Sequence, residues 1–432
     1  MTFVIPAPVL DLLHLLREKG IPAFVVGGAV RDMCLDRLPG DVDILADASI
    51  DTLKTVFEGR PFRVVGNSFP VCLVNDIEVA PCRTASGQFP EDDLSMRDFT
   101  VNAMAYDPLE NRLLDPFDGR SDLENGIIRF TGDPDARIKE DPVRMIRGCR
   151  FSTALSARLS DSARKAIQQH AGSLVTHIPG ERIRNELLKA MTLSRPSVFF
   201  RCLYITGLLA GILPSLDRCY ALDGGPFHGE TVFEHCMLVG DALPARQPLL
   251  RLAGYLHDVG KVESQGIKDE RITFHGHETC LDALAADLDR LRFSVQEKDY
   301  IQALVRCHMR PLAEKTRPKS IRRLLAMLAQ NRLSFQDFMR MRIADKKGNL
   351  AKSPYTLADI RDRVEKVRKE MARQTAFHTD DLKVSGQDVM TVKGIPPGPE
   401  VGRIKQQLFE KVLEDPSLNT REQLLEMLQD MD

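Results

Sequence analysis

Two aspartates spaced by one residue follow a glycine pair near the start of the chain, in VVGGAVRDMCLDRLPGDVDIL (25–45). Asp41 and Asp43 are expected at a strand, where residues i and i+2 point to the same face. Two carboxylates on one face repel each other unless a cation lies between them, and oxygen ligands favour Mg²⁺. Two such ions can activate an attacking hydroxyl and stabilise a leaving pyrophosphate.

The glycine pair itself suits a phosphate group. Gly27 and Gly28 let main-chain amides approach a triphosphate closely, and Arg31 would add positive charge beside the same phosphates. An isolated Gly-Gly or Asp-x-Asp sequence is more often a surface turn or a solvated acidic loop. The two together, in this order and at this spacing, favour a nucleotide site.

Two later segments also place acidic and basic side chains at short spacing. Arg97 and Asp98 stand in RDFTVNA, and Asp141 and Arg144 stand in EDPVRMIRGCRF. We predict the latter pair on one helix, where residues i and i+3 are neighbours. Such a pair presents donors and acceptors that can pair with a nucleobase, although it can equally be an ion pair at a helix start. The basic face continues with Arg147 and Arg150. These two arginines could either contact phosphate or pack within the protein.

A second group of ligand-type residues lies between residues 225 and 350. Histidine and carboxylate together suit divalent transition metals, and open coordination positions would hold an activating water. The set is, in chain order, His235, His257, Asp258, His277, His308 and Asp345. Any lone histidine is more often a core or surface residue, so it is the ordered set, with HDVGK intact, that predicts a metal site.

The elements that must position these residues change along the chain. Five short apolar runs bounded by Gly, Pro and Asn read as strands. These are Ala23–Gly27, Asp43–Ala46, Arg63–Val65, Val71–Val74 and Ile77–Ala80. After residue 130 apolar residues recur at helical spacing. The sequence therefore predicts an α+β head followed by an all-α remainder.

Composition narrows the class of protein. The chain has 432 residues and a formal net charge of −2, so no global basic field draws it to nucleic acid. Its nine cysteines, with no Cys-x-x-Cys pair, indicate reduced thiols and a cytoplasmic location. The N-terminus lacks a signal-peptide pattern, and no apolar run approaches the roughly 20 residues that cross a bilayer.

In these motifs the chain resembles two known families. GGAVRD, DVD, RDFTVNA, DPFDG, EDPVRMIRGCRF and ERIRNEL resemble the class II, bacterial-type tRNA nucleotidyltransferases, the CCA-adding family that also contains poly(A) polymerases. The histidine and aspartate set resembles an HD-domain phosphohydrolase. The resemblance implies a polymerase-β-like head (1–130), a helical neck that binds RNA and nucleobase (131–220), an HD body (225–350) and a helical tail (351–432).

The resemblance also implies a role for individual residues. Asp41 and Asp43 would bind catalytic Mg²⁺, with Glu78 as a further acidic group beside them. The nucleotide would meet Gly28, Arg31, Arg97, Asp98, Asp141, Arg144, Arg147 and Arg150. The body metal, whether Mn, Ni or Mg, would have His235, His257, Asp258 and Asp345 as core ligands and His277 and His308 as extra ligands. Lys261 would contact phosphate.

Two departures from the family pattern bear on the reaction. Met96 stands where the family usually has a second arginine before Arg97 and Asp98. Only residues 84–90 separate Arg83 from Glu91, where CCA-adding members have a longer loop that switches the site from CTP to ATP. The short stretch resembles CC-adding enzymes, so we expect addition of two CMP residues to the acceptor end of tRNA, alongside a separate A-adding enzyme.

Several alternatives stay open at this point. One is full CCA addition from CTP and ATP. A poly(A) polymerase, a hydrolase of nucleotide signals and a non-catalytic RNA-binding module are others. The HD body would add phosphatase or phosphodiesterase activity. The basic segments 317–325 and 360–370 either follow the phosphates of a tRNA acceptor stem or are solvated helix faces.

Overall fold

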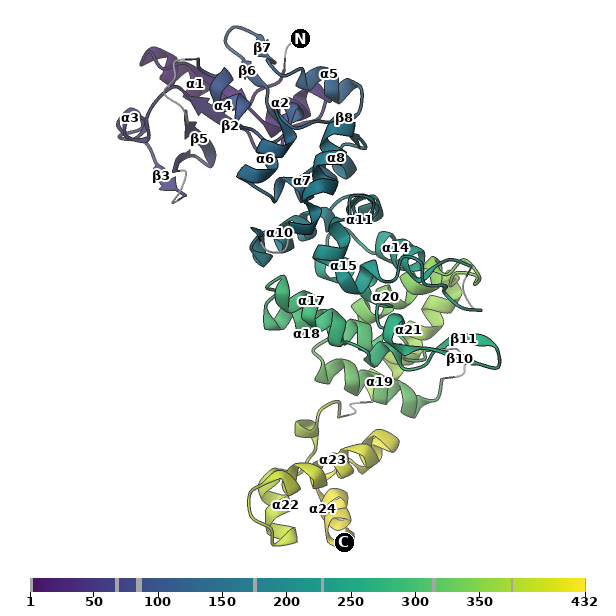
Figure 1. Cartoon of the computed structure of the whole chain (residues 1–432). Coiled ribbons are helices and arrows are strands. Elements are labelled where there is room, and N and C mark those ends of the chain that lie inside the picture. Colours follow the sequence, from purple (N-terminus) through teal and green to yellow (C-terminus); the bar gives the residue numbers. More distant parts are fainter. Residues whose placement is uncertain are drawn as a thin grey trace. The chain divides into compact units, whose positions relative to one another are not determined.

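The computed structural model describes residues 3–66, 70–82, 88–173, 177–226, 229–312, 316–373 and 376–431. The chain forms two compact units (Figure 1). The first comprises residues 1–186 and 198–211, and the second comprises residues 187–197 and 212–432.

The first unit is built on a seven-stranded sheet. The strands are β1 (Ala23–Val26), β2 (Asp43–Ala46), β3 (Phe62–Val65), β4 (Val71–Val74), β5 (Ile77–Pro81), β6 (Ala105–Asp107) and β7 (Arg112–Leu114). Their order is β3-β4-β5-β2-β1-β6-β7, and β2 with β5 is the parallel pair. Central strands such as β1 are apolar on both faces because both faces are covered.

Helices cover the two faces of this sheet and continue beyond it. They are α1 (Ala7–Glu18), α2 (Gly28–Cys34), α3 (Ile50–Val56), α4 (Glu91–Ser95), η1 (Thr100–Asn102), α5 (Gly119–Glu124), α6 (Pro134–Glu140), α7 (Arg144–Ala154), α8 (Asp161–His170) and η2 (Ala171–Ser173). The short strands β8 (Ile127–Ile128) and β9 (Arg158–Leu159) pair in parallel. The main core lies between the sheet and helices α1 to α3, with Leu16, Val30 and Phe57 fully buried. A smaller core on the other face contains Phe24, Leu45 and Leu94.

Helices α10 (Gly180–Met191), α11 (Pro196–Ile205) and α12 (Leu208–Ile212) contain the points at which the chain changes units. The second unit is helical apart from one hairpin. Its elements are α13 (Pro214–Asp217), α14 (Val232–Ala242), α15 (Pro248–Leu256), α16 (Lys261–Ser264), β10 (Gln265–Lys268), β11 (Arg271–Phe274), η3 (His277–Thr279), α17 (Asp282–Arg290), α18 (Val295–Cys307), α19 (Pro318–Gln330), α20 (Phe335–Gly348), α21 (Leu357–Ala372), η4 (Thr379–Asp381), α22 (Gly386–Lys393), α23 (Pro399–Glu414), η5 (Pro416–Leu418) and α24 (Arg421–Asp430).

Small residues let the helices of the second unit approach closely. A Cβ on Gly348 of α20 would come within 2.7 Å of Val239 Cγ2 on α14. A Cβ on Gly240 would come within 2.4 Å of the ring of Tyr255 on α15. Helices α14, α15 and α20 therefore form one tightly packed group, and the residues they carry toward its interior are fixed by that packing.

The α+β head followed by a helical remainder is confirmed. Each of the five strands predicted from the sequence exists, with bounds shifted by at most one residue. Residues 83–87, which include most of the short stretch before α4, lie outside the described residues. Among the helices that the structure describes, none combines the length and apolar composition that crossing a bilayer requires. The four-domain division stays a prediction.

Candidate functional site

The glycine turn and the carboxylate strand of the head meet beside Arg97. Gly27 has a φ of +70°, which favours glycine. A Cβ at this position would come within 2.5 Å of Arg97 Nη1, so only glycine leaves room for the guanidinium. Burial raises the pKa of the Asp43 carboxyl, while the nearby Arg97 opposes that rise and Asp41 adds to it. The structure thus brings together the glycines, one cation and both predicted metal ligands.

Glu78 lies on the strand next to these aspartates. The parallel register pairs Ile44 with Val79, so Glu78 precedes Val79 as Asp43 precedes Ile44. Because partners in a ladder share a face, Glu78 and Asp43 point to the same side of the sheet. Asp41 lies two residues before β2, which begins at Asp43, so the expectation that both aspartates stand on the strand holds for Asp43 alone. Asp41 is nevertheless close enough to raise the pKa of Asp43, and oxygen ligands of this kind suit a hard cation.

Arg31 of α2 is held close to the same turn. Its Nε donates to Asp32 Oδ1 at 2.9 Å and its Nη1 donates to Asn102 Oδ1 at 2.7 Å. Its Nη2 lies 3.5 Å from the place that a Cβ of Gly28 would take. These bonds tie α2 to η1 and fix the guanidinium over the start of α2, beside the predicted phosphate position.

Asp98 is the centre of a buried polar network. Its carboxylate accepts from Asn102 Nδ2 at 3.0 Å and from Phe99 N at 2.9 Å. Arg147 donates two bonds to its other oxygen, at 2.8 and 2.5 Å. Burial alone would raise the pKa of Asp98, but Arg147 and these hydrogen bonds hold it below its ordinary value. The ribose contact expected of Asp98 stays a prediction.

This network makes a stability prediction with a defined pH dependence. Asp98→Asn should lower the free energy of unfolding at pH 7 by about 3 kcal/mol, because it leaves a largely buried Arg147 without its main counter-charge. The folded-state pKa of Asp98 lies below the ordinary 3.8, so its contribution is present above that value and is lost as pH falls through the folded-state pKa.

Urea unfolding followed by circular dichroism at pH 7 and pH 3 measures this difference. The gap between the parent chain and Asp98→Asn should narrow at the lower pH. The exposed Glu18 provides a control, and Glu18→Gln should change neither value. An equal loss at both pH values would mean that the carboxylate charge is not what stabilises the network.

Asp141 and Arg144 do not lie on one helix, so that prediction is wrong. Asp141 ends α6 in an extended conformation, with φ −149° and ψ 95°, and α7 begins at Arg144. The cause is Pro142, because a residue before proline disfavours helical angles. The Asp141 carboxylate instead accepts both Nη groups of Arg182, at 2.9 and 2.8 Å.

Arg144 also has partners other than Asp141. Its Nη1 donates to Glu140 Oε2 at 2.8 Å, and its Nη2 donates to the main-chain oxygen of Met96 at 3.1 Å. The main-chain N–H of Arg144 bonds to Asp141 O at 3.0 Å, which keeps the two residues adjacent. The position that departs from the family pattern, Met96, is thus tied by its main chain to a predicted base-reading arginine.

The two arginines that continue this helix are engaged within the first unit. Arg147 lies 3.7 Å from Glu186 in addition to its bonds with Asp98. Arg150 Nε donates to Glu186 Oε2 at 2.6 Å, and its guanidinium lies 4.3 Å from the centre of the Phe151 ring. The sequence left open whether these arginines meet phosphate or pack within the protein, and in the structure both pack against acidic and aromatic side chains. Their role toward a nucleotide stays a prediction.

One arginine in each of the two basic segments, 317–325 and 360–370, turns inward. Arg322 is 4% exposed and binds Glu370 Oε2 at 2.7 Å and two main-chain carbonyls at the end of α23, at 2.8 and 2.6 Å. Arg363 is 8% exposed and binds main-chain carbonyls at 2.8 and 2.7 Å. These two cations are therefore engaged inside the second unit and are not presented to a nucleic acid.

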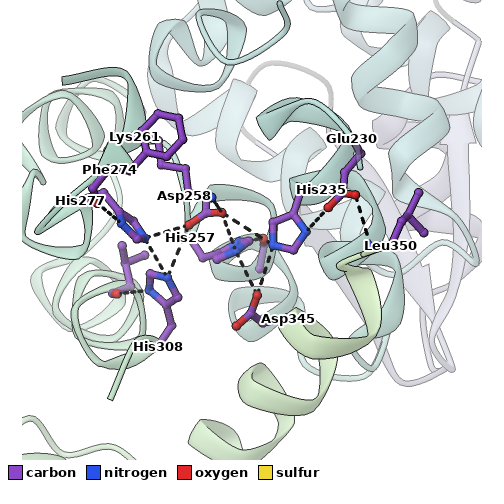
Figure 2. A network of polar contacts seen from close by, with 12 residues as sticks. Glu230, His235, His257, Asp258, Lys261, Phe274, His277, His308, Asp345 and Leu350 are labelled. Atoms are coloured by element: carbon purple, nitrogen blue, oxygen red, sulfur yellow. Dashed lines mark hydrogen bonds and ion pairs between the residues drawn. The ribbon is translucent and has the colours of Figure 1, made fainter. Parts of the chain in front are cut away.

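The second site lies inside the helical unit, where the six predicted ligands converge (Figure 2). His235 lies within α14, His257 and Asp258 follow α15, His277 opens η3, His308 follows α18 and Asp345 lies in α20. The four histidines are each at most 4% exposed. The six residues are spread over 111 positions of the sequence, from His235 to Asp345, and the fold brings them into one cluster.

Asp258 stands at the centre of this cluster (Figure 2). Its Oδ1 lies 3.1 Å from His277 Nε2 and 3.5 Å from His308 Nε2. Its Oδ2 lies 3.3 Å from His257 Nε2 and 3.7 Å from His235 Nε2. Two groups of potential metal ligands therefore share this one carboxylate, with the ligand atoms of each group within 4.8 Å of one another.

Asp345 and Lys261 complete the charges around the cluster. Asp345 Oδ1 lies 3.2 Å from His235 Nε2 and 3.9 Å from His257 Nε2. Lys261 Nζ lies 2.8 Å from Asp258 Oδ2, so the predicted phosphate contact of Lys261 is at present an ion pair with a ligand. Burial opposes ionisation of both carboxyls, but the surrounding imidazoles and Lys261 hold the pKa of Asp258, and the imidazoles that of Asp345, below the ordinary value.

The donor set fits a divalent cation. His257 Nε2 is buried and has no hydrogen-bond partner among the described residues, yet it faces two carboxylates. Burial lowers the pKa of His257, which keeps the imidazole neutral and able to act as a ligand. A nitrogen in this position is explained by a metal ion, since a buried polar atom otherwise costs free energy.

A cavity of about 480 Å³ opens onto this cluster. Asp258, His277, His308 and Asp345 line its floor, and cationic and aromatic side chains line its walls. The wall residues include Arg342, Lys346, Lys352 and Tyr355. Positive charge beside two sets of metal ligands suits a phosphate ester.

Sequence reasoning missed the residues that orient the ligands. Arg182 binds Asp141, Glu186 binds two arginines of α7, and Glu230 lies 3.2 Å from His235 Nδ1. Arg182 and Glu186 stand in ERIRNEL, a motif that carries the family resemblance without showing which residues they contact. Glu230 directly precedes the cap residue of α14, a position with no sequence signal for metal chemistry.

Three family models match the chain in order. Residues 23–129 match the poly A polymerase head domain. Residues 158–220 match a model described as the probable RNA and SrmB-binding site of polymerase A. Residues 228–332 match the HD domain. Asp41, Asp43 and Glu78 lie within the first segment and the four histidines and Asp258 within the third, whereas Asp345 and the residues from Asp141 to Arg150 lie outside all three.

Individual relatives and a solved structure agree with these matches. An A-adding tRNA nucleotidyltransferase of Deinococcus radiodurans is 31% identical over 427 residues, covering 91% of this chain and 93% of that protein. A CC-adding tRNA nucleotidyltransferase of Halalkalibacterium halodurans is 38% identical over 200 residues, covering 46% of this chain and 52% of that protein. The CCA-adding enzyme of Bacillus stearothermophilus, solved with CTP, has the same fold, with a TM-score of 0.67 at 24% identity over 99% of this chain and 98% of that one.

Proposed function

Because the chain belongs to the tRNA nucleotidyltransferase family, we propose that its head adds CMP residues from CTP to the 3′ end of tRNA without a nucleic-acid template. The observation that carries the proposal is the acidic group at the start of β2: Asp43 and Glu78 on neighbouring strands, with Asp41 just before β2, near the Gly27 turn and Arg97. Mg²⁺ bound by these carboxylates would activate the 3′ hydroxyl and stabilise the leaving pyrophosphate.

The chain's own residues support the rest of the reaction by positioning. The Gly27 turn and Arg31 would receive the triphosphate, since α2 begins directly after the turn at Gly28 and the guanidinium is fixed over the start of that helix. Asp141 and Arg144 would read the base, once the base replaces Arg182 on one carboxylate oxygen. Transfer of a nucleotidyl group needs little more than this alignment and charge complementarity.

The number and identity of the nucleotides added rest on a different observation. Cys82 and α4 are joined by residues 83–90 alone, and this short connection favours CC addition over full CCA addition. A second candidate is addition of the terminal AMP alone. It is favoured by the similarity to the A-adding enzyme of Deinococcus radiodurans, which extends over 91% of this chain.

Nucleotide incorporation resolved to single residues distinguishes these reactions. Three tRNA transcripts are used: one that lacks the 3′ CCA, one that ends in C and one that ends in CC. Each receives Mg²⁺ with CTP, with ATP, or with both. If the enzyme adds CC, CTP alone should extend the first transcript by two residues, the second by one and the third by none. Adding ATP should not change these numbers. Addition of AMP to the CC end only, or a third residue with ATP, would replace this assignment by A addition or full CCA addition.

We further propose that the helical unit is a metal-dependent phosphohydrolase acting on phosphate monoesters or diesters of RNA ends, including cyclic phosphates. The support is the pair of ligand groups around Asp258 and the cationic cavity that opens onto them. The residues suit Mn²⁺, Ni²⁺ or Mg²⁺, and a bound ion would supply an activated water. Such an activity would restore damaged 3′ ends before nucleotide addition.

A further inference from the structure

The histidines of the helical unit share a feature that sets which nitrogen faces the site. In three of them, Nδ1 contacts the main-chain oxygen three residues earlier. The pairs are His257 with Gly254 at 2.8 Å, His277 with Phe274 at 2.9 Å and His308 with Val305 at 2.6 Å. A proton on Nδ1 in each leaves Nε2 free to coordinate and pointing into the cluster.

His235 cannot use this arrangement, because it lies within a helix. The last carbonyls of a helix lack main-chain partners, which is why His257 and His308, at the ends of α15 and α18, can bind them. In α14 the main-chain N–H of His235 already bonds to Thr231 O at 2.9 Å, and the helix uses its carbonyls internally. An oxygen for Nδ1 of His235 must therefore come from a side chain.

The side chain of Glu230 places a carboxylate oxygen next to this nitrogen, as an ion-pair contact. Its Oε1 lies 3.2 Å from His235 Nδ1 (Figure 2). The side chain of Glu230 is 4% exposed. Its Oε2 accepts the N–H groups of Gly229 at 3.0 Å and Leu350 at 3.2 Å. The carboxylate is thus fixed by main-chain donors on both sides of the site, and it would cost free energy to bury it here without a purpose.

The ring of His235 is held between two carboxylates that approach from opposite sides. Asp345 Oδ1 faces Nε2 at 3.2 Å, while Glu230 faces Nδ1. Asp345 lies in α20, and Leu350, which binds Glu230, follows the same helix two residues after its end. Glu230 therefore joins the ligand His235 to the segment that enters the cavity wall with Lys352.

We propose that Glu230 is the positioning residue of the metal subsite formed by His235, His257, Asp258 and Asp345. It accepts the Nδ1 proton of His235, so that Nε2 is the unprotonated donor, and its negative charge strengthens that donor. The second subsite, formed by Asp258, His277 and His308, does not depend on it. The proposal rests on the metal centre of the proposed hydrolase.

The test is Mn²⁺ titration of the full-length chain by calorimetry, with metal content measured after gel filtration. The head carboxylates carry Asp41→Asn and Asp43→Asn in every sample, so that only the helical unit binds Mn²⁺. Glu230→Gln should weaken one of two sites by about 10- to 100-fold and leave the other unchanged. The melting temperature of the metal-free chain should not change.

Two further variants keep the result interpretable. Glu270→Gln alters an exposed carboxylate in the hairpin turn and should leave both affinities unchanged. Glu230→Asp keeps the charge but withdraws it from Nδ1, so it should give a smaller loss at the same subsite. Equal weakening of both subsites with a lower melting temperature, or no weakening, would overturn the role of Glu230. A parent chain that binds no Mn²⁺ in this unit would instead refute the proposed hydrolase.

Discussion

Asp43→Asn should reduce the rate of CMP incorporation by about 10³-fold or more, whereas phosphohydrolysis in the other unit should be unchanged. The substitution keeps the size and shape of the side chain but removes the charge that would hold Mg²⁺ next to the 3′ hydroxyl. A loss of about 4 kcal/mol of transition-state stabilisation corresponds to this factor. Asp41→Asn should give a similar result, since both carboxylates are proposed as ligands of the same Mg²⁺ site.

Single-turnover incorporation of CTP into a tRNA that lacks its 3′ CCA measures the effect. Asp47 offers a matched control, because it is exposed and directly follows the other end of β2. Asp47→Asn should incorporate CMP at the parent rate. If Asp43→Asn retained more than a tenth of the parent rate, Asp43 would not be a metal ligand of the reaction, whatever its neighbours.

The second large effect concerns Asp258. Asp258→Asn should abolish phosphohydrolysis and leave CMP incorporation intact. The carboxylate belongs to both ligand groups, so its loss removes a donor from each of them at once. His257→Ala combined with Asp258→Ala should give the same outcome, because the remaining ligands of that subsite would be His235 and Asp345 alone.

Asp258 also forms an ion pair with the buried Lys261, so stability must be measured in parallel. Removing one partner of a buried pair costs about 3 to 5 kcal/mol. Retained CMP incorporation and an intact circular dichroism spectrum would show that the chain is folded while hydrolysis is lost. Asp282→Asn, an exposed substitution at the start of α17, provides the control. Simultaneous loss of both activities would contradict independent sites.

The strands of the head could be predicted closely because each is a short apolar run between breakers. Val71–Val74 and Ile77–Pro81, for example, are separated by Asn75 and Asp76, both of which have positive φ in the turn. Strands β6 and β7 gave no such signal. Each has three residues, too few to show alternation, and both exist because they extend an established sheet.

The candidate sites divide in the same way. The cluster around Asp258 could be predicted, because its histidines and aspartates, and the HDVGK motif, can be recognised from the sequence alone. The partners that orient ligands could not, because Arg182 reaches Asp141 over 41 positions and Leu350 reaches Glu230 over 120. The prediction that Asp141 and Arg144 share one helix was wrong, and the reason was present in the sequence. Pro142 disfavours helical angles at the residue before it, and this effect outweighs the helical spacing of the two side chains.

The two buried arginines of the second unit, Arg322 and Arg363, have a consequence for the thermodynamics of the proposed RNA binding. A cation contributes to the salt dependence of such binding when it displaces counterions condensed on phosphates. Arg322 and Arg363 bind carbonyls and a carboxylate inside the protein, so they displace none. The affinity for tRNA should therefore fall less steeply with ionic strength than the number of basic residues in these helices implies, and shape would carry more of the recognition.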